Sequence, residues 1–172
     1  FTMDNAIVLG VGGGTINVNN VSQTLTLSGV ISGVGALTKI NGDSSITPLL
    51  AASWTVTPDN KTWAFKLKPG VKFHNGEPFT AESVKFSLDR AGGDKSTNKD
   101  KRSFAKVSTH VVDKHTVVLI NEDIDPDFLF VLGQATAIIV EPKSAASNGT
   151  QPVGTGPFKL ENWAKGSAVV LD

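Results

Sequence analysis

The stretch from Leu49 to Val84 reads LLAASWTVTPDNKTWAFKLKPGVKFHNGEPFTAESV. Polar and apolar residues alternate in Ser53–Val56 and again in Thr62–Leu67, which is the pattern of strands with one buried face. The turn-forming run Pro58–Lys61 separates them, so the stretch predicts a β-hairpin. Buried aromatic side chains each remove roughly 150–250 Å² from water and can pack together on one sheet face. The candidates for that face are Trp54, Trp63, Phe65 and Phe73.

A helix is predicted directly after this hairpin, from Thr80 to Arg90. Thr80 is a plausible N-cap, and Ser83 occupies the third helical position, where a capping box would have Glu. The apolar residues fall at spacings of four and three and share one helix face, which we expect to be buried. These residues are Val84, Leu88 and Ala91.

The rest of the chain alternates hairpins with short helical segments. A polar loop, Asp94–Arg102, separates the first helix from the next strands. Further elements are expected as a hairpin at Val107–Asp113 and Thr116–Asn121, a short helix at Pro126–Leu132, a buried strand at Thr136–Val140, and strands at Phe158–Trp163 and Ala168–Leu171. Strands and helices in this order predict an α+β fold.

Residues 1–38 have a different texture, rich in Gly, Asn, Ser, Thr and Val. Short alternating runs at Thr15–Val18 and Thr24–Leu27 are separated by turn-forming residues, which is typical of closely spaced strands in a β-solenoid repeat. We therefore predict two parts, a β-repeat over residues 1–38 and an α+β part over residues 39–172.

Composition excludes several classes of protein. Sixteen basic residues balance sixteen acidic ones, so a nucleic-acid partner has no electrostatic support. The absence of cysteine excludes disulfides, zinc held by cysteine and thiol catalysis. The longest apolar runs fall far short of the ~20 residues of a membrane span, and no export signal is visible in the chain.

The stretch quoted above closely resembles the family 5 extracytoplasmic solute-binding proteins, which serve dipeptide, oligopeptide and nickel importers. A second matching motif follows in the same order, PVGTGPFKL from Pro152 to Leu160, with Trp163 downstream. Ser83 is the one notable departure, because an Asp is usual there. The signature residues are Trp54, Trp63, Phe65, Gly70, Phe73, His74, Gly76, Gly154, Thr155, Gly156 and Pro157.

The resemblance implies part of the first lobe of a two-lobed periplasmic-binding-protein fold of type II. It implies a non-catalytic binding component of an ABC transporter that works outside the cytoplasm, in the periplasm. The implied partners are a peptide-like solute and the membrane permease, with no nucleic acid and no cofactor. Family members are several times longer, so we expect the second lobe to lie outside this chain.

The same resemblance offers ligand contacts. The family lines its cleft partly from the segment that matches Gly133–Ile138, which implicates Gln134, Thr136 and Ala137. A buried strand without any ligand role is the alternative for this segment. Nickel-type members use an Arg here, and its absence disfavours a nickel complex as the ligand.

The segment from Gly12 to Lys39 resembles a passenger repeat of bacterial autotransporters. We infer a fusion of two sequences with its junction near Leu37–Lys39. Whether this fusion is natural, engineered or an assembly artefact stays open. If residues 1–38 define the native context, the alternative function is a secreted or outer-membrane β-repeat structural protein.

Catalytic and metal sites are not expected. No Gly-x-Ser-x-Gly elbow is present, although a hydrolase stays the alternative from the enzyme class. The histidines His74, His110 and His115 lack the spacing of metal ligands on one element, so no metal site is predicted.

Overall fold

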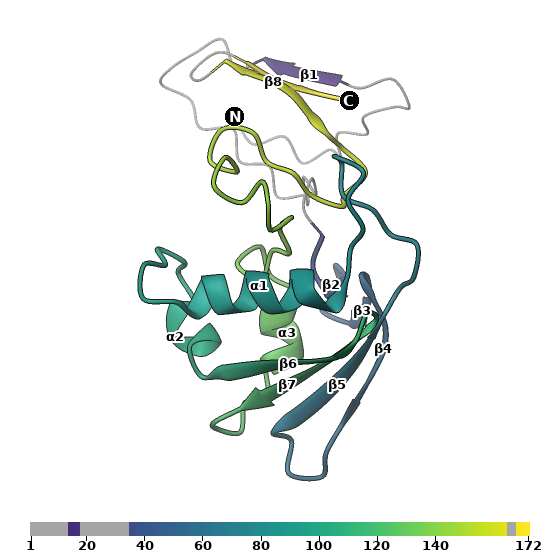
Figure 1. Cartoon of the computed structure of the whole chain (residues 1–172), viewed down its shortest axis with the longest axis vertical. Helices are drawn as coiled ribbons and strands as arrows, with labels where there is room; N and C mark the ends of the chain where they lie inside the picture. Colours follow the sequence, from purple (N-terminus) through teal and green to yellow (C-terminus); the bar gives the residue numbers. More distant parts are fainter. Residues whose placement is uncertain (1–13, 18–34, 165–167) are drawn as a thin grey trace.

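The computed structural model describes residues 14–17, 35–164 and 168–172. The elements in chain order are β1 (Gly14–Asn17), β2 (Thr38–Ile40), β3 (Ile46–Pro48), β4 (Ala51–Val56), β5 (Thr62–Leu67), α1 (Ala81–Gly92), α2 (Lys101–Phe104), β6 (Val107–Asp113), β7 (Thr116–Asn121), α3 (Phe128–Leu132), β8 (Leu160–Ala164) and β9 (Ala168–Leu171). Figure 1 shows a main body around β4–β7 and the helices, with β1 and β8 at the opposite end. The fold is α+β, as the sequence predicts.

The main body is built on a four-stranded antiparallel sheet in the order β4-β5-β7-β6. Both predicted hairpins are confirmed. In the first turn, Asp59 accepts hydrogen bonds through Oδ1 from the hydroxyl of Thr57 at 2.5 Å and the backbone N–H of Lys61 at 3.1 Å. Asn60 adopts a φ of 57°, the left-handed region that Asn tolerates better than most residues. Local turn chemistry therefore sets the register of β4 against β5.

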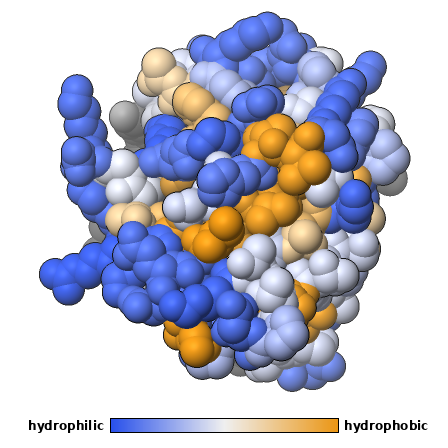
Figure 2. Space-filling view, turned by 60° about the horizontal axis from the view of Figure 1, so that its bottom comes forward, coloured by the Kyte–Doolittle hydropathy of each residue, from blue (hydrophilic) through white to orange (hydrophobic). Residues whose placement is uncertain are grey.

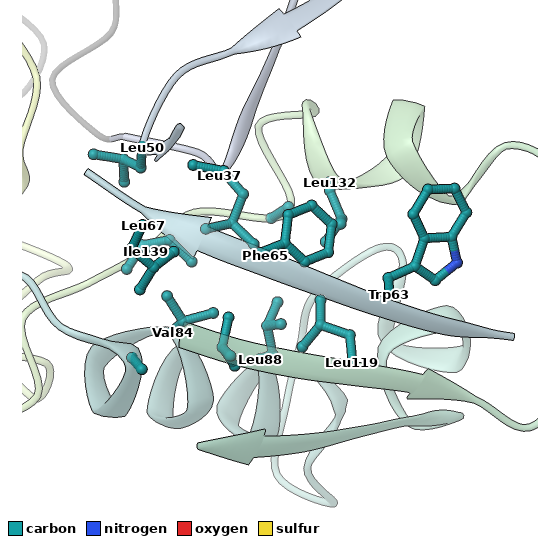
Figure 3. Packing of buried hydrophobic residues seen from close by; sticks show 14 of the residues in the cluster. Leu37, Leu50, Trp63, Phe65, Leu67, Val84, Leu88, Leu119, Leu132 and Ile139 are labelled. Carbon is teal, nitrogen blue, oxygen red and sulfur yellow. The ribbon is translucent and has the colours of Figure 1, made fainter. Parts of the chain in front are cut away.

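One face of this sheet is buried under α1 and α3 (Figures 1 and 3). Register places Phe65 opposite Val117 and Trp63 opposite Leu119, and Figure 3 shows this layer beside Val84 and Leu88 of α1. The core also includes Phe73, Phe79, Phe104, Phe128, Leu132 and Ile139.

The expectation that Trp54 and Trp63 are both largely buried is only half right. Trp63 is 7% exposed, but Trp54 is half-buried at the margin of the core. The physical reason is that β4 is an edge strand. Trp54 contacts Phe65 on one side, with ring centroids 6.1 Å apart, and no other described strand pairs with β4 on its far side.

Helix α1 confirms the capping and periodicity expected of it. Thr80 is its N-cap, and Oγ of Ser83 accepts the backbone N–H of Thr80 at 3.4 Å, in the place of the usual acidic side chain. Val84 and Leu88 are buried, with Ala91 packed beside the core. A serine is therefore compatible with the helix start at this position.

The predicted strand at Thr136–Val140 is wrong, although Ala137, Ile139 and Val140 are buried. The backbone hydrogen bonds of this segment go to separate partners instead of a neighbouring strand. Ile139 N–H donates to the carbonyl oxygen of Gly35 at 3.0 Å, and Val140 N–H donates to Oγ of Ser87 at 3.0 Å. An apolar run can be buried without a ladder when other groups satisfy its backbone.

A second sheet has the order β1-β9-β8, with both pairs antiparallel. Strand β1 overlaps the alternating run expected at Thr15–Val18, whereas the run at Thr24–Leu27 lies outside the described residues. The strands expected near Phe158–Trp163 and at Ala168–Leu171 are confirmed as β8 and β9.

The predicted boundary between residues 38 and 39 falls inside β2. Leu37 and Thr38 are 1% and 0% exposed, and the hydroxyl of Thr38 donates to the carbonyl oxygen of Leu129 at 3.0 Å. Leu37 and Thr38 therefore pack with the main body. The main body includes residues on both sides of the predicted boundary. The division of the chain into two parts stays a prediction.

The surface near the main sheet is mixed in polarity. Figure 2, which brings the lower end of Figure 1 forward, shows a band of apolar side chains among hydrophilic ones. Exposed apolar residues on the main sheet include Val56, Val112 and Ile120. Among the described residues, no helix combines the length and apolar character needed to cross a membrane.

Candidate functional site

A pocket with a volume of about 800 Å³ lies beside the C-terminal half of α1. Three pieces of chain line it: the end of α1 with the following loop, the irregular segment after α3, and the loop before the second signature motif. The lining residues are Ser87, Arg90, Ala91, Gly93–Asn98, Ala135, Thr136, Ile138, Val140, Asn148, Gly149 and Pro152. We call this space pocket 1.

Side-chain hydrogen bonds join two of these pieces. Thr136 donates its hydroxyl to Oδ2 of Asp100 at 2.5 Å, and Asn98 donates its side-chain N–H to the carbonyl oxygen of Thr136 at 2.8 Å. Asn98 is itself positioned, because its Oδ1 accepts the backbone N–H of Asp100 at 2.8 Å. The polar loop expected at Asp94–Arg102 is thus fixed against the segment that follows α3.

The inner wall of pocket 1 is held by Ser87, whose side chain is buried within α1. Its hydroxyl donates to the carbonyl oxygen of Ser83 at 2.7 Å and accepts the backbone N–H of Val140 at 3.0 Å. One hydroxyl therefore replaces a strand neighbour for Val140 and ties that segment to the helix. The buried face of α1 therefore fixes the position of this wall.

Charge in pocket 1 is uneven. Arg90 and Lys95 line it from α1 and the adjoining loop, together with the single carboxylate of Asp94. Within the described part of the chain, neither basic side chain forms an ion pair or a side-chain hydrogen bond. Two free cations beside hydroxyl and amide groups form a surface suited to a polar or anionic small molecule.

The three residues implicated by resemblance do not share one environment. Thr136 lines pocket 1, but Ala137 is 2% exposed and belongs to the main core. Gln134 is half-buried and lines neither pocket 1 nor the second pocket described below. A ligand role for the three remains a prediction, and the structure places Thr136 alone at a cavity.

Several pocket-lining residues escaped the sequence patterns, above all Arg90, Lys95, Asn98 and Asn148. Three of them lie outside any regular element, where polar residues give no periodic signal. The one available indication is that loops positioned by a rigid scaffold carry binding groups more often than core elements do. The charged loop after Gly92–Gly93 fits that description.

A second pocket of about 410 Å³ lies between the turn His74–Glu77, the loop Thr150–Val153 and β8. His74 lines it and also joins the two signature motifs. The backbone N–H of His74 donates to the carbonyl oxygen of Gly154 at 2.9 Å, and its Nε2 lies 2.8 Å from the carbonyl oxygen of Gly156. Gly76, in the same turn, has a φ of 86°, a conformation that favours glycine.

Glu141 is a buried carboxylate next to this turn, with 2% exposure. Burial raises the pKa of Glu141, but the backbone N–H of Lys143, the Ser144 groups and the Asn75 amide together lower it more, so the net pKa lies below its ordinary value. The distances to its oxygens are 2.8 Å from Lys143 N, 2.8 Å from Ser144 N and 3.2 Å from Asn75 Nδ2. Glu141 is therefore held as a hydrogen-bonded anion.

Metal binding has no support among the residues that the structure describes, since no three His, Asp or Glu side chains converge there. Pocket 1 presents hydroxyl, amide and guanidinium groups. The hydroxyls of Ser87 and Thr136 already donate hydrogen bonds to oxygen atoms of the protein. Such an arrangement can bind and orient a polar molecule.

Comparison with known families finds one that matches most of the chain. Residues 45–172 match the model of the bacterial extracellular solute-binding proteins, family 5 Middle. Both signature motifs and the lining of both pockets lie within the matched residues.

The glutathione-binding protein GsiB of Salmonella typhi is 29% identical over 165 residues, which cover 93% of this chain and 32% of that protein. The aligned 93% of this chain is more than residues 39–172 contain, so the similarity extends into residues 1–38. The chain spans about a third of the length of the curated relatives it matches.

Solved structures give the same picture. AgaA of A. tumefaciens R10, in complex with agropinic acid, has a TM-score of 0.75 and 30% identity, covering 81% of this chain and 29% of that one. The ABC transporter-associated periplasmic binding protein DppA of Helicobacter pylori, in complex with the peptide STSA, has a TM-score of 0.72 and 27% identity, covering 80% and 32%.

Proposed function

Because this chain belongs to the bacterial extracellular solute-binding proteins of family 5, we propose that it forms part of the first lobe of such a protein and that pocket 1 is this lobe's share of the solute site. The role is binding and delivery, and the family is not enzymatic. The parent would close two lobes around its solute, a hinge motion favoured by contacts made only in the closed state.

The observation that carries this proposal is the pair of free cations in pocket 1, whose lining mixes polar and apolar side chains. Arg90 and Lys95 line about 800 Å³ of space without any ion pair among the described residues. Cation-to-carboxylate hydrogen bonds are roughly twice as strong as neutral ones, so these side chains favour a solute with a carboxylate. Glutathione, agropinic acid and a peptide, named for the relatives above, all carry carboxyl groups.

The implied partners follow from the family. A peptide-like solute would be released to the membrane permease of an ABC importer, outside the cytoplasm and in the periplasm of a bacterial cell envelope. Supporting this, DppA is described as associated with an ABC transporter and as periplasmic. A nickel complex is disfavoured, since the segment Ala135–Val140 contributes no Arg to pocket 1.

The test uses the whole chain and two matched probes. Reduced glutathione carries two free carboxylates, and its diethyl ester carries none. In ¹⁵N–¹H NMR titrations at millimolar concentrations, glutathione should shift the backbone signals of Ser96, Asn98 and Asn148 in saturable fashion, and the ester should shift them much less. Arg90→Ala should weaken the response.

Arg102→Ala is the matched control, because Arg102 is an exposed arginine on α2 that lines neither pocket. It should leave the titration unchanged. Equal responses to glutathione and its ester, or shifts scattered away from pocket 1, would show that the pocket is not a site for anionic solutes.

The division of the chain into an autotransporter-like segment 1–38 and a binding-lobe segment 39–172 stands as a second proposal. Two truncations test where the binding part begins. A chain starting at Gly35 keeps Leu37 and Thr38 in the core, and one starting at Lys39 loses both. If the binding part begins at Lys39, as this division proposes, the two truncated chains should unfold at the same temperature. A loss of about 2–5 kcal/mol in the second, the range for deletion of a buried Leu side chain, would instead place the start of the binding part before Leu37.

A further inference from the structure

We propose that His74, Asn75 and Glu141 form a clasp that positions one wall of pocket 1, so that His74 and Glu141 are positioning residues for solute binding although neither lines that pocket. The inference rests on the proposed function of pocket 1. It gives a physical role to signature residues that have no direct contact with the cavity.

The first half of the clasp is the set of hydrogen bonds between His74 and the second signature motif. Besides the two bonds described above, the backbone N–H of Gly154 lies 3.4 Å from Nδ1 of His74. A ring that accepts at Nδ1 can donate from Nε2, so the neutral tautomer protonated at Nε2 satisfies Gly154 and Gly156 together. A backbone bond and both ring nitrogens hold Gly154–Gly156 in place.

The second half is the bond between Asn75 and Glu141. Asn75 donates through Nδ2 to the buried carboxylate, and its Oδ1 accepts the backbone N–H of Glu77 at 3.2 Å. The same carboxylate accepts the N–H groups of Lys143 and Ser144, so it fixes the start of the following loop. Losing any one donor would leave part of a buried charge unsatisfied, which is costly.

The clasp therefore holds the chain by hydrogen bonds on both sides of residues 145–153, at residues 141–144 and at 154–156. Asn148, Gly149 and Pro152 lie between these two held segments and line pocket 1. The loop has hydrogen bonds of its own, such as Gln151 N–H to the carbonyl oxygen of Ser147 at 2.8 Å and Val153 N–H to Oδ1 of Asn148 at 3.3 Å. These bonds shape the loop, while the clasp sets where it sits against α1.

A wall fixed before the solute arrives lowers the cost of binding, because the loop does not have to be ordered at that moment. Releasing one end frees the loop and adds this cost to association. The clasp residues should thus affect binding through loop order, whereas an exposed bond in the same region should not. Lys143 and Glu77 supply that comparison, since their ion pair has side-chain exposures of 76% and 40%.

Hydrogen–deuterium exchange of the whole chain tests the clasp without any ligand. In His74→Ala, exchange of the 145–153 amides should accelerate roughly tenfold, as expected when one or two net hydrogen bonds are lost. Exchange in β5 and β7 should stay unchanged. His74→Gln keeps a side-chain donor and should recover most of the protection, while His110→Ala and Lys143→Ala, at exposed positions, should have no effect.

A glutathione titration of the same variants completes the test. Where the wild type responds, His74→Ala should weaken the apparent affinity and His74→Gln should restore it. Unchanged exchange in 145–153, or exchange accelerated equally in the main sheet, would overturn the clasp. If the exchange pattern holds but no variant responds to glutathione, the clasp stands as a structural device and the proposed function of pocket 1 fails.

Discussion

Trp63 donates its indole Nε1–H to the carbonyl oxygen of Asn60 at 3.2 Å, back across the turn of its own hairpin. Its ring also packs against Phe128 at the start of α3, with centroids 5.8 Å apart and planes inclined by 51°. A single side chain therefore connects the β4–β5 turn, the centre of the main sheet and a helix from much later in the sequence.

Trp63→Ala should destabilise the chain by about 3–5 kcal/mol, the usual cost of removing a buried aromatic ring from a packed core. Urea unfolding followed by circular dichroism measures this. Trp54→Ala is the comparison and should cost less, because Trp54 is half-buried on an edge strand. A loss below about 0.5 kcal/mol for Trp63→Ala would place that side chain on the surface and disprove the packing described here.

Ala135 and Ala137 separate the roles of pocket and core. Ala137→Leu should cost about 1–3 kcal/mol of stability, because extra methyl groups would overpack a site that is 2% exposed. Ala135→Leu, at an exposed position lining pocket 1, should change stability by less than about 0.5 kcal/mol and weaken the glutathione response. The reverse pattern in thermal unfolding and titration would return Ala137 to the cleft.

Glu141 should make the stability of the chain depend on acidity. Its folded-state pKa lies below the ordinary 4.5, since hydrogen bonds outweigh the effect of burial. The carboxylate therefore stabilises the fold above that ordinary pKa, and this contribution is lost as the pH falls through the lower folded-state value.

Glu141→Gln should cost about 1–3 kcal/mol near neutral pH, where a charged acceptor is replaced, and progressively less in acid. Urea midpoints at a series of pH values give the comparison, with the exposed Glu161→Gln as the control. A difference between Glu141→Gln and the wild type that is the same at pH 7 and in strong acid would argue against a buried, hydrogen-bonded anion.

Peptide affinity of the chain by itself should be weak. Pockets typically bury about 70–90% of a small ligand, and association loses translational and rotational freedom worth ~4–15 kcal/mol. A chain that spans 32% of its relatives supplies a part of that enclosure. Calorimetric titration with a mixed library of di- to pentapeptides should show no binding of micromolar or tighter affinity. Micromolar or tighter binding would show that one lobe is a sufficient site.

The sequence alone determined the elements that local chemistry specifies. Turn residues at Pro58–Lys61 set one hairpin, and alternation set its strands. Thr80 and Ser83 marked the start of α1, because caps act within a single turn of chain. The paired motifs around His74 and Gly154 identified the family, because both survive as continuous strings of residues.

Tertiary structure decided what depends on contacts between distant segments. Thr136–Val140 has the composition of a strand, yet its backbone is satisfied by Gly35 and Ser87, so no ladder forms. Pocket 1 combines Arg90 at the end of α1 and Lys95 in the following loop with Asn148, more than fifty residues later in the sequence, and that separation hides their proximity. Periodicity records which face of an element is buried, but polar loop residues meet only when the chain folds, and no local pattern encodes that meeting.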